Sequence, residues 1–235
     1  MRIFDNIRLK QAVRAGWLVL LLPIGATAAN LQEFEHRYNV SVKGRNAGVA
    51  ELALNRIDEN TYRLATTLVP NQAAKLLGAE QSEDAIEFSP ENNNWRVKSY
   101  RQQRRGRKAG ITEVKPNGDR HYVLNLDGKQ VIQINRTLIE PQTFPISIML
   151  LRKKQLENRQ IMLIRRNGFR AHVYRNQGPE TVEVQGKTYE TTRWKRQDAS
   201  KNYNWYTIWV DERTDIPVRI QRNKKGSKTT LELIE

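Results

Sequence analysis

The clearest alternation of hydrophobic and polar positions lies near the C-terminus. Aromatic and aliphatic residues dominate 203–210, and a polar turn separates them from a second apolar run at 216–220. In that run Val218 and Ile220 would point to one side of an extended chain and their neighbours to the other. A final alternating segment covers 229–235. The pattern predicts three antiparallel strands that each bury one face.

The same period of two recurs along most of the chain. Residues 34–43 alternate cleanly, a glycine-containing turn follows at 44–48, and later hairpins are predicted at 161–174 and 182–194. We therefore predict a mainly β protein: one curved antiparallel sheet of about 11–12 strands with one or two short helices. A sheet this long should curl into a half-barrel or barrel-like shape.

Two segments break the alternation. Apolar residues follow helical spacing over 143–156, where Thr143 can cap the helix and a proline suits its first turn. We predict one amphipathic helix there, packed on the concave face of the sheet or plugging one end. The segment 71–79 is expected to form a loop or one helical turn. With Leu76 and Leu77 it is either a flexible lid over a cavity or a short connection pinned by those side chains.

Residues 1–28 carry the pattern of a cleavable signal peptide. Four basic residues precede an apolar run at 16–25, and the Ala-Thr-Ala sequence at 26–28 fits a small-residue cleavage site. The apolar run is far shorter than the roughly 20 residues that a membrane-spanning helix needs, and Pro23 interrupts it. We predict a single exported β domain over 29–235, a periplasmic location, and no transmembrane segment after cleavage.

Composition narrows the chemistry and the choice of partner. The 235 residues include no cysteine, which excludes disulfides, thiol nucleophiles, thiolate metal sites and lipid attachment at a lipobox cysteine. The net charge is +15, and loss of the leader, with four basic residues and one acidic residue, leaves +12. This excess favours anionic partners. In a periplasm these would be lipid, lipopolysaccharide or another anionic envelope component; the alternative is a basic protein with no polyanion ligand.

The strongest charge cluster lies at 101–108. Its basic residues, our candidates for anion binding, are Arg101, Arg104, Arg105, Arg107 and Lys108. A block of this kind forms either an anion-binding hairpin loop or a solvated turn. No aromatic residue is interleaved with it, which argues against single-stranded nucleic acid, and we expect no nucleic-acid partner.

Catalytic chemistry has little support in the sequence. His36, His121 and His172 fall in different predicted strands, with none of the spacings that hold a metal ion. No nucleophile elbow, phosphate-binding loop or dinucleotide-binding glycine pattern is present. The acidic turn around Asp211 and Asp215 could supply paired carboxylates, but a local Asp–Arg contact explains it more simply. We predict no enzyme activity, no cofactor and no metal site.

Several segments resemble a known family. Residues 38–40 with the turn from Gly44 to Ala50 look like its opening strands, and 184–191 looks like one of its hairpins. Trp209-Val210-Asp211 with Ile-Pro-Val-Arg-Ile at 216–220 is similar to its closing strands. The family is the bacterial exported domain-of-unknown-function family 3108. The resemblance covers most of 33–235 and is weakest in the basic block and the predicted helix.

This resemblance implies a compartment and a fold. It implies an exported, curved antiparallel sheet, related in shape to lipoprotein carriers of the LolA/LolB type, with a helix against the concave side. No catalytic residue is assigned in that family, so none is implied here. The link to lipid carriage is an analogy of fold alone.

Two functional hypotheses follow. The first is a periplasmic, non-catalytic binding or carrier module whose curved sheet holds an apolar or anionic amphiphilic ligand. The residues that we expect to line its interior are Trp95, Ile146, Met149, Leu150, Trp194, Trp205 and Trp209. The second is a structural or interaction protein of the cell envelope, in which these residues are plain core and the basic surface alone binds a partner.

Overall fold

The computed structural model describes residues 31–91, 94–106, 109–118, 121–135, 139–141, 158–165, 168–198 and 201–234. These residues form 15 strands in one sheet and one short helix, α1 (Gln72–Leu76). The strands are β1 Phe34–Val42, β2 Arg45–Asp58, β3 Thr61–Pro70, β4 Gln81–Glu91, β5 Asn94–Arg105, β6 Gly110–Pro116, β7 His121–Leu126, β8 Lys129–Asn135, β9 Ile139–Pro141, β10 Asn158–Arg165, β11 Gly168–Val184, β12 Lys187–Asp198, β13 Lys201–Asp211, β14 Pro217–Lys224 and β15 Ser227–Leu233.

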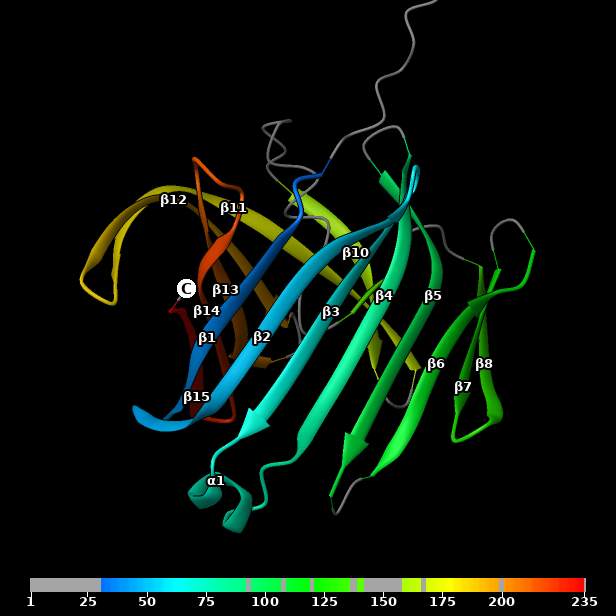
Figure 1. Cartoon of the computed structure of the whole chain (residues 1–235), viewed down its shortest axis with the longest axis horizontal. Coiled ribbons are helices and arrows are strands. Elements are labelled where there is room, and N and C mark those ends of the chain that lie inside the picture. Colours follow the sequence, from blue (N-terminus) through cyan, green and yellow to red (C-terminus); the bar gives the residue numbers. More distant parts are fainter. Residues whose placement is uncertain are drawn as a thin grey trace, which may run out of the picture.

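The two ends of the folded chain meet in the middle of the sheet. The strand order is β8-β7-β6-β5-β4-β3-β2-β1-β15-β14-β13-β12-β11-β10-β9, and β1 pairs with β15. One meander therefore runs outward from β1 to β8, and the other runs outward from β15 to β10 (Figure 1). All described pairings are antiparallel except that of β9 with β10. We call these meanders the first arm, β1–β8, and the second arm, β9–β15.

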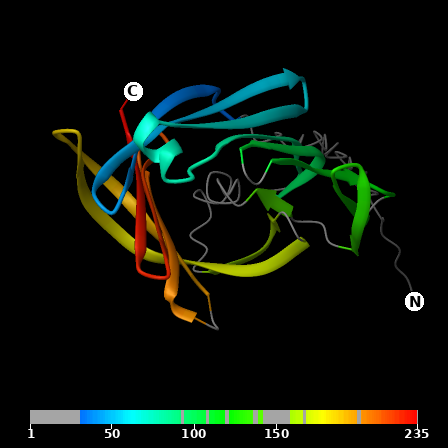
Figure 2. The same cartoon turned by 90° about the horizontal axis from the view of Figure 1, so that it is seen from below.

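Register shifts bend the sheet so that the arms face each other. Bulge-like shifts interrupt β1–β2, β2–β3, β4–β5, β7–β8, β11–β12, β12–β13 and β13–β14. Each extra residue bends its strand and increases the local twist, and a long twisted sheet curls on itself. The view toward α1 shows the arms curving around a common interior (Figure 2).

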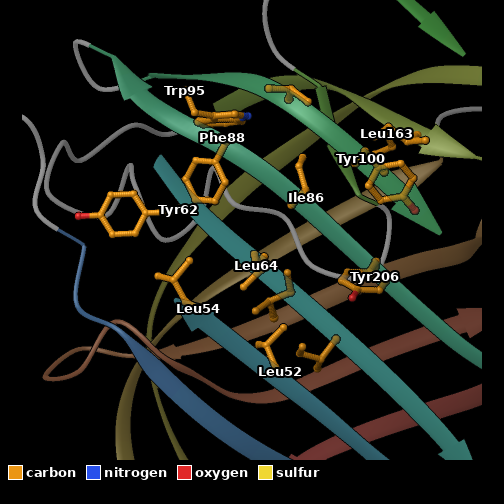
Figure 3. Packing of buried hydrophobic residues seen from close by; sticks show 14 of the residues in the cluster. Leu52, Leu54, Tyr62, Leu64, Ile86, Phe88, Trp95, Tyr100, Leu163 and Tyr206 are labelled. Atoms are coloured by element: carbon orange, nitrogen blue, oxygen red, sulfur yellow. The ribbon is translucent and has the colours of Figure 1, made fainter. Parts of the chain in front are cut away.

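The face that points into this interior carries the main hydrophobic core; we call it the inner face. Period-two burial builds it, as in β2, where Ala50, Leu52 and Leu54 are buried and their neighbours are more exposed. The same cluster includes Trp194 and Ile208 from the second arm, so side chains of both arms form one continuous core. Figure 3 shows part of this packing, with Tyr62 and Phe88 stacked at a ring-centroid distance of 6.1 Å.

A second, smaller cluster lies on the outer face of the second arm. Val182, Val184, Trp209 and Val218 form it. Trp209 is directly opposite Arg193 and Arg219 in the sheet, whereas the adjacent Ile208 belongs to the inner core. The β11–β12–β13 region therefore buries residues on both faces.

The predicted fold class is confirmed: the molecule is a mainly β, curved antiparallel sheet. The C-terminal three-strand meander is also confirmed as β13, β14 and β15. The described strands exceed the 11–12 expected, partly because β9 has three residues and too little pattern to recognise. The hairpins predicted at 161–174 and 182–194 share one continuous strand, β11, which passes the Gly-Pro pair with a register shift between Asn176 and Pro179.

The connection between β3 and β4 corrects one of the sequence-based alternatives. It contains the single helical turn α1, but Leu76 is 83% exposed and Leu77 is 90% exposed. These leucines therefore do not pin the connection to the core. Asn71 holds it instead: its side-chain oxygen accepts a hydrogen bond from Ala74 N at 2.8 Å, and its Nδ2 donates to Asn46 O at 3.0 Å. The helix predicted over 143–156 lies outside the described residues.

Candidate functional site

A row of alternating tyrosine and arginine side chains crosses the inner face of the second arm. Strand register places Tyr174 of β11 opposite Arg196 of β12, Arg196 opposite Tyr206 of β13, and Tyr206 opposite Arg222 of β14. Each belongs to the same alternation as apolar core residues, such as Trp194 beside Arg196 and Ile220 beside Arg222. The apolar phase of β12 and that of β14 therefore become cationic at this level.

Arg196 is held between the two aromatic rings. Its guanidinium carbon lies 5.5 Å from the Tyr174 ring centroid and 4.8 Å from the Tyr206 ring centroid. Its Nη1 donates a hydrogen bond to Tyr174 Oη at 3.2 Å, and the residue is 6% exposed. Two cation–π contacts in a desolvated setting attract the guanidinium and fix its position.

The first arm presents polar side chains at the same level. Asp84 of β4 is opposite Gln102 of β5, Gln102 is opposite Thr112 of β6, and all three are buried. Arg104, two residues beyond Gln102 on the same face, is half-buried. We call the inner-face residues of both arms at this level the interior cluster: Asp84, Tyr100, Gln102, Arg104, Tyr174, Arg196, Tyr206 and Arg222.

Electrostatic effects connect the two arms within the interior cluster. Burial raises the pKa of Tyr206 to about 12, with the nearby positive charges of Arg196 and Arg222 opposing that rise and Asp84 adding to it. Burial also raises the pKa of Tyr100, again with a contribution from Asp84. The carboxyl of Asp84 therefore acts on tyrosines of both arms, which Figure 3 labels on their two strands.

Arg222 experiences the excess of positive charge most directly. Burial lowers its pKa, and the like charges of Arg196 and Arg104 lower it further, against a favourable contribution from Tyr206. Three guanidinium groups and one carboxylate belong to the interior cluster. Because arginine stays protonated in proteins, Asp84 can balance at most one of the three positive charges. The arrangement is therefore suited to an anion.

The interior cluster lies near one end of the curled sheet. Arg104, Arg196 and Arg222 stand close to the ends of β5, β12 and β14, and Asp84 stands close to the start of β4. Because these strands are antiparallel, those positions share the end of the sheet that carries α1. Leu54, Tyr62, Phe88 and Trp95 occupy the other end of the interior (Figure 3). The interior is thus apolar at one end and cationic at the other.

The predicted lining tryptophans do not share one surface. Trp95 and Trp194 are both 2% exposed and belong to the inner core. Trp209 belongs to the outer cluster, and Trp205 lies on the same side of β13 as Trp209 and is half-buried. The structure thus brings two of the four to the interior. Ile146, Met149 and Leu150 lie outside the described residues.

The predicted basic block is split between the two faces of β5. Arg104 points inward with Gln102, whereas Arg101 and Arg105 are exposed on the outer face. Arg101 lies 3.6 Å from Glu113, and Arg105 lies 3.3 Å from Glu83. Arg107 and Lys108 lie outside the described residues. The described part of the block therefore does not form one anion-binding loop.

The remaining candidate groups lie outside the interior cluster. The three histidines lie on β1, β7 and β11, which are not adjacent strands. In the acidic turn, the Asp211 carboxylate accepts hydrogen bonds from Thr214 N at 3.0 Å and Thr214 Oγ1 at 2.6 Å. Thr214 therefore closes the turn on the Asp211 side. The neighbouring Arg219 instead forms an ion pair with Glu232 at 2.8 Å.

Sequence reasoning missed Arg196, Arg222 and Asp84. A usable signal was present, because each replaces an apolar residue in the buried phase of its strand, as Arg222 does two residues after Ile220. A charged residue in a buried phase is unusual enough to mark a site. What the sequence could not supply is that the three lie at one level of the interior.

Comparisons with known proteins give information about the fold of this chain but none about its activity. No family model matches the sequence, and no curated protein matches it. The chain is similar to the crystal structure of a β-barrel-like protein of the domain of unknown function DUF1849 from Brucella abortus. That similarity has a TM-score of 0.58 and 10% identity, over 88% of this chain and 97% of that chain. At this identity the likeness shows a shared fold alone.

A second solved structure is more distant. It is the hypothetical lipoprotein YmcC from Escherichia coli, which aligns with 88% of this chain and 89% of its own length, at 10% identity and a TM-score of 0.33. Neither of these proteins carries an assigned activity in its description. The described part of the chain contains no helix with the length and hydrophobicity needed to cross a membrane.

Proposed function

We propose that this protein is a non-catalytic binding or carrier module of the bacterial cell envelope that holds an amphiphile with an anionic head group. The head group would contact Arg104, Arg196 and Arg222. The apolar part would lie along the aromatic inner face toward Phe88 and Trp95. The observation that carries the proposal is the set of three inward-facing arginines that share one carboxylate.

The cost of burying charge supports this reading. A buried ion is strongly destabilising unless a partner compensates it. Arg196 is 6% exposed and is positioned by two tyrosine rings, yet a second guanidinium group, that of Arg222, lies near it and also experiences the charge of Arg104. An anionic ligand would offset this repulsion and would gain charge-assisted hydrogen bonds from donors that are already oriented.

The polarity of the interior supports an amphiphile rather than a small inorganic anion. Apolar side chains continue from the cluster toward the far end of the interior, where Leu54 and Phe88 are fully buried. Ligand sites of this kind combine a mainly apolar lining with a few polar groups that fix orientation. An acyl chain with one negatively charged end matches that order of contacts.

The envelope location rests on the leader. The predicted signal peptide at 1–28 and the resemblance to the exported family 3108 both favour export to the periplasm. In that compartment, fatty acids, phospholipids and lipopolysaccharide supply anionic amphiphiles. Membership of family 3108 stays a prediction.

The first experiment is native mass spectrometry of the processed protein from the periplasm, followed by organic extraction and analysis of any bound molecule. We expect an anionic lipid or glycolipid bound in a simple ratio. An empty protein that also fails to take up a fluorescent fatty acid would refute the proposal. It would favour the alternative, an envelope interaction protein with a solid interior.

A pair of variants on one strand tests where the head group binds. Arg104→Gln removes an inward-facing charge, and Arg101→Gln removes an outward-facing charge three residues away on β5. Loss of a charge-assisted hydrogen bond should weaken fatty-acid binding about tenfold for Arg104→Gln, whereas Arg101→Gln should bind as the unaltered protein does. The two variants should bind a neutral fatty alcohol with similar affinity, because that ligand has no negative charge for Arg104 to contact. Equal effects of the two substitutions on the fatty acid would disprove the assigned position.

A further inference from the structure

The turns around α1 form one continuous end of the sheet. Lys43 N, in the β1–β2 turn, donates a hydrogen bond to Lys228 O of the β14–β15 turn at 2.8 Å. Asn71, which caps α1, is bonded to Asn46 of the same β1–β2 turn. The segment after α1 meets the β5–β6 turn, where a Cβ on Gly106 would lie 3.0 Å from Glu80 Cγ. We call these turns together the α1 end; Figure 1 shows it below the strands.

Two leucines project from the α1 end. Leu76 and Leu77 have the highest exposure among the large hydrophobic residues of the described chain, at 83% and 90%. α1 buries none of its residues, yet it is tied to the β1–β2 turn through the cap. Adjacent exposed leucines on an anchored turn leave apolar surface in water that a monomer has no folding reason to present.

Basic residues lie on the turns and strand ends that share this end of the sheet with the two leucines. The exposed basic residues of the described part of the α1 end are Lys43, Arg45, Lys75, Arg105, Lys224, Lys225 and Lys228. The described acidic residues at this end of the sheet are Glu80, Glu83 and Asp127, and Glu83 pairs with Arg105 at 3.3 Å. An apolar tip with a cationic surround is the composition of surfaces that insert shallowly into anionic membranes, where basic residues meet phosphate groups and apolar residues enter the acyl boundary.

The opposite end of the molecule carries more acidic residues. The residues leading into β1 and the turns β2–β3 and β13–β14 contain Glu33, Asp58, Glu59, Glu212 and Asp215, while the described basic residues at this end include Arg56, Lys187 and Arg213. The charge is therefore distributed along the strand direction, which would orient the protein at an anionic surface.

We propose that the α1 end docks on the surface of a bilayer that contains anionic phospholipid, with Leu76 and Leu77 inserted into the acyl boundary and the surrounding lysines and arginines on the phosphates. The proposal goes beyond the binding function above, since it concerns the outer surface. Arg104 and Arg222 of the interior cluster stand at the same end as α1, so docking through α1 would turn the proposed head-group site toward the membrane.

The test is co-sedimentation of the processed protein with vesicles of phosphatidylglycerol and phosphatidylethanolamine, compared with vesicles of phosphatidylcholine alone. Binding should be confined largely to the anionic vesicles and should weaken as salt rises. The double variant Leu76→Gln/Leu77→Gln should lose at least about tenfold in affinity. Ile57→Gln is the control, because Ile57 is 50% exposed at the opposite end and should not contribute.

Charge reversal tests how much the basic residues contribute to vesicle binding. Lys224→Glu/Lys225→Glu should lower binding about tenfold or more, while Lys187→Glu/Arg213→Glu at the opposite end should not. Equal binding to both vesicle types, or unchanged binding after leucine replacement, would overturn the proposal. Absence of vesicle binding together with crosslinking of the α1 end to an envelope protein would also overturn it. Arg104→Gln should bind vesicles normally, so failure of the interior site and failure of the docking surface are distinguishable.

Discussion

Adding one carbon atom at Gly48, as in Gly48→Ala, should strongly lower the stability of the folded protein. Gly48 lies on β2 opposite Val40, beside the register shift in β1–β2, with a φ of +144°. A Cβ at this residue would lie 2.2 Å from Val69 O and 2.8 Å from Pro70 Cα, both backbone atoms of β3. Gly48→Ala therefore forces a strained backbone and pushes apart the pairing of β2 with β3.

The expected cost follows from three contributions. A non-glycine residue in this region of φ costs about 1–3 kcal/mol. Separating Cβ from the Val69 carbonyl by about 1 Å would strain the hydrogen bond from Asn71 N to Ala47 O at 3.0 Å and that from Asn71 Nδ2 to Asn46 O, each worth about 1 kcal/mol. We expect a loss of about 3–5 kcal/mol, a large share of the 5–15 kcal/mol typical of a folded domain.

The assay is urea denaturation of the processed protein, followed by tryptophan fluorescence and far-ultraviolet circular dichroism. Gly44→Ala is the matched control, because Gly44 has a φ of +78° in the same hairpin but no atom within 4 Å of its would-be Cβ. That variant should lose about 1 kcal/mol, the cost of the left-handed conformation alone. If the two variants lose the same free energy of unfolding, the close approach of β3 has no energetic weight and the reasoning fails.

Three further results are expected. Burial raises the pKa of Tyr206 from 10.0 to about 12, so the contribution of its neutral side chain to stability is complete below pH 10 and is lost as the pH rises toward 12. Tyr206→Phe should reduce the loss of stability above pH 10 in denaturation curves, and an unchanged loss would contradict this. Leu54→Ala, at a fully buried position, should cost about 2–5 kcal/mol, whereas Ile57→Ala on the same strand should cost far less in the same measurement. Asn71→Ala should cost about 1 kcal/mol and speed amide hydrogen exchange in α1, while exchange in the central strands stays slow; faster exchange there would argue against a local cap.

The strand assignments could be predicted because burial in a sheet has a period of two. In β2 the buried residues Ala50, Leu52 and Leu54 alternate with more exposed neighbours, and in β14 Ile220 is buried between two partly exposed residues. Local sequence records which side of a strand is buried, so the pattern survives without knowledge of partners. The fold class followed from the number of such segments.

Local signals failed where a distant contact decides the outcome. The two hairpins predicted at 161–174 and 182–194 imply a break between them, yet β11 continues across it because β12 pairs with β11 on both sides of the irregularity. Leu76 and Leu77 fit a connection pinned to the core, yet the hydrogen bonds of Asn71 hold it while both leucines face solvent. In each case a residue far away in the chain supplies the deciding interaction.

The candidate site shows which features the sequence alone determines and which depend on the tertiary structure. The sequence by itself determined the mainly β class, the alternation of each strand, the excess of positive charge and the absence of thiol chemistry. It also held Arg196 and Arg222 in buried phases of their strands. Only the tertiary structure brought them to the level of Arg104 and Asp84, because the β1–β15 pairing and the curl set which residues of the two arms face each other. Period and composition are local properties, whereas the approach of two arms depends on register and twist accumulated over many strands.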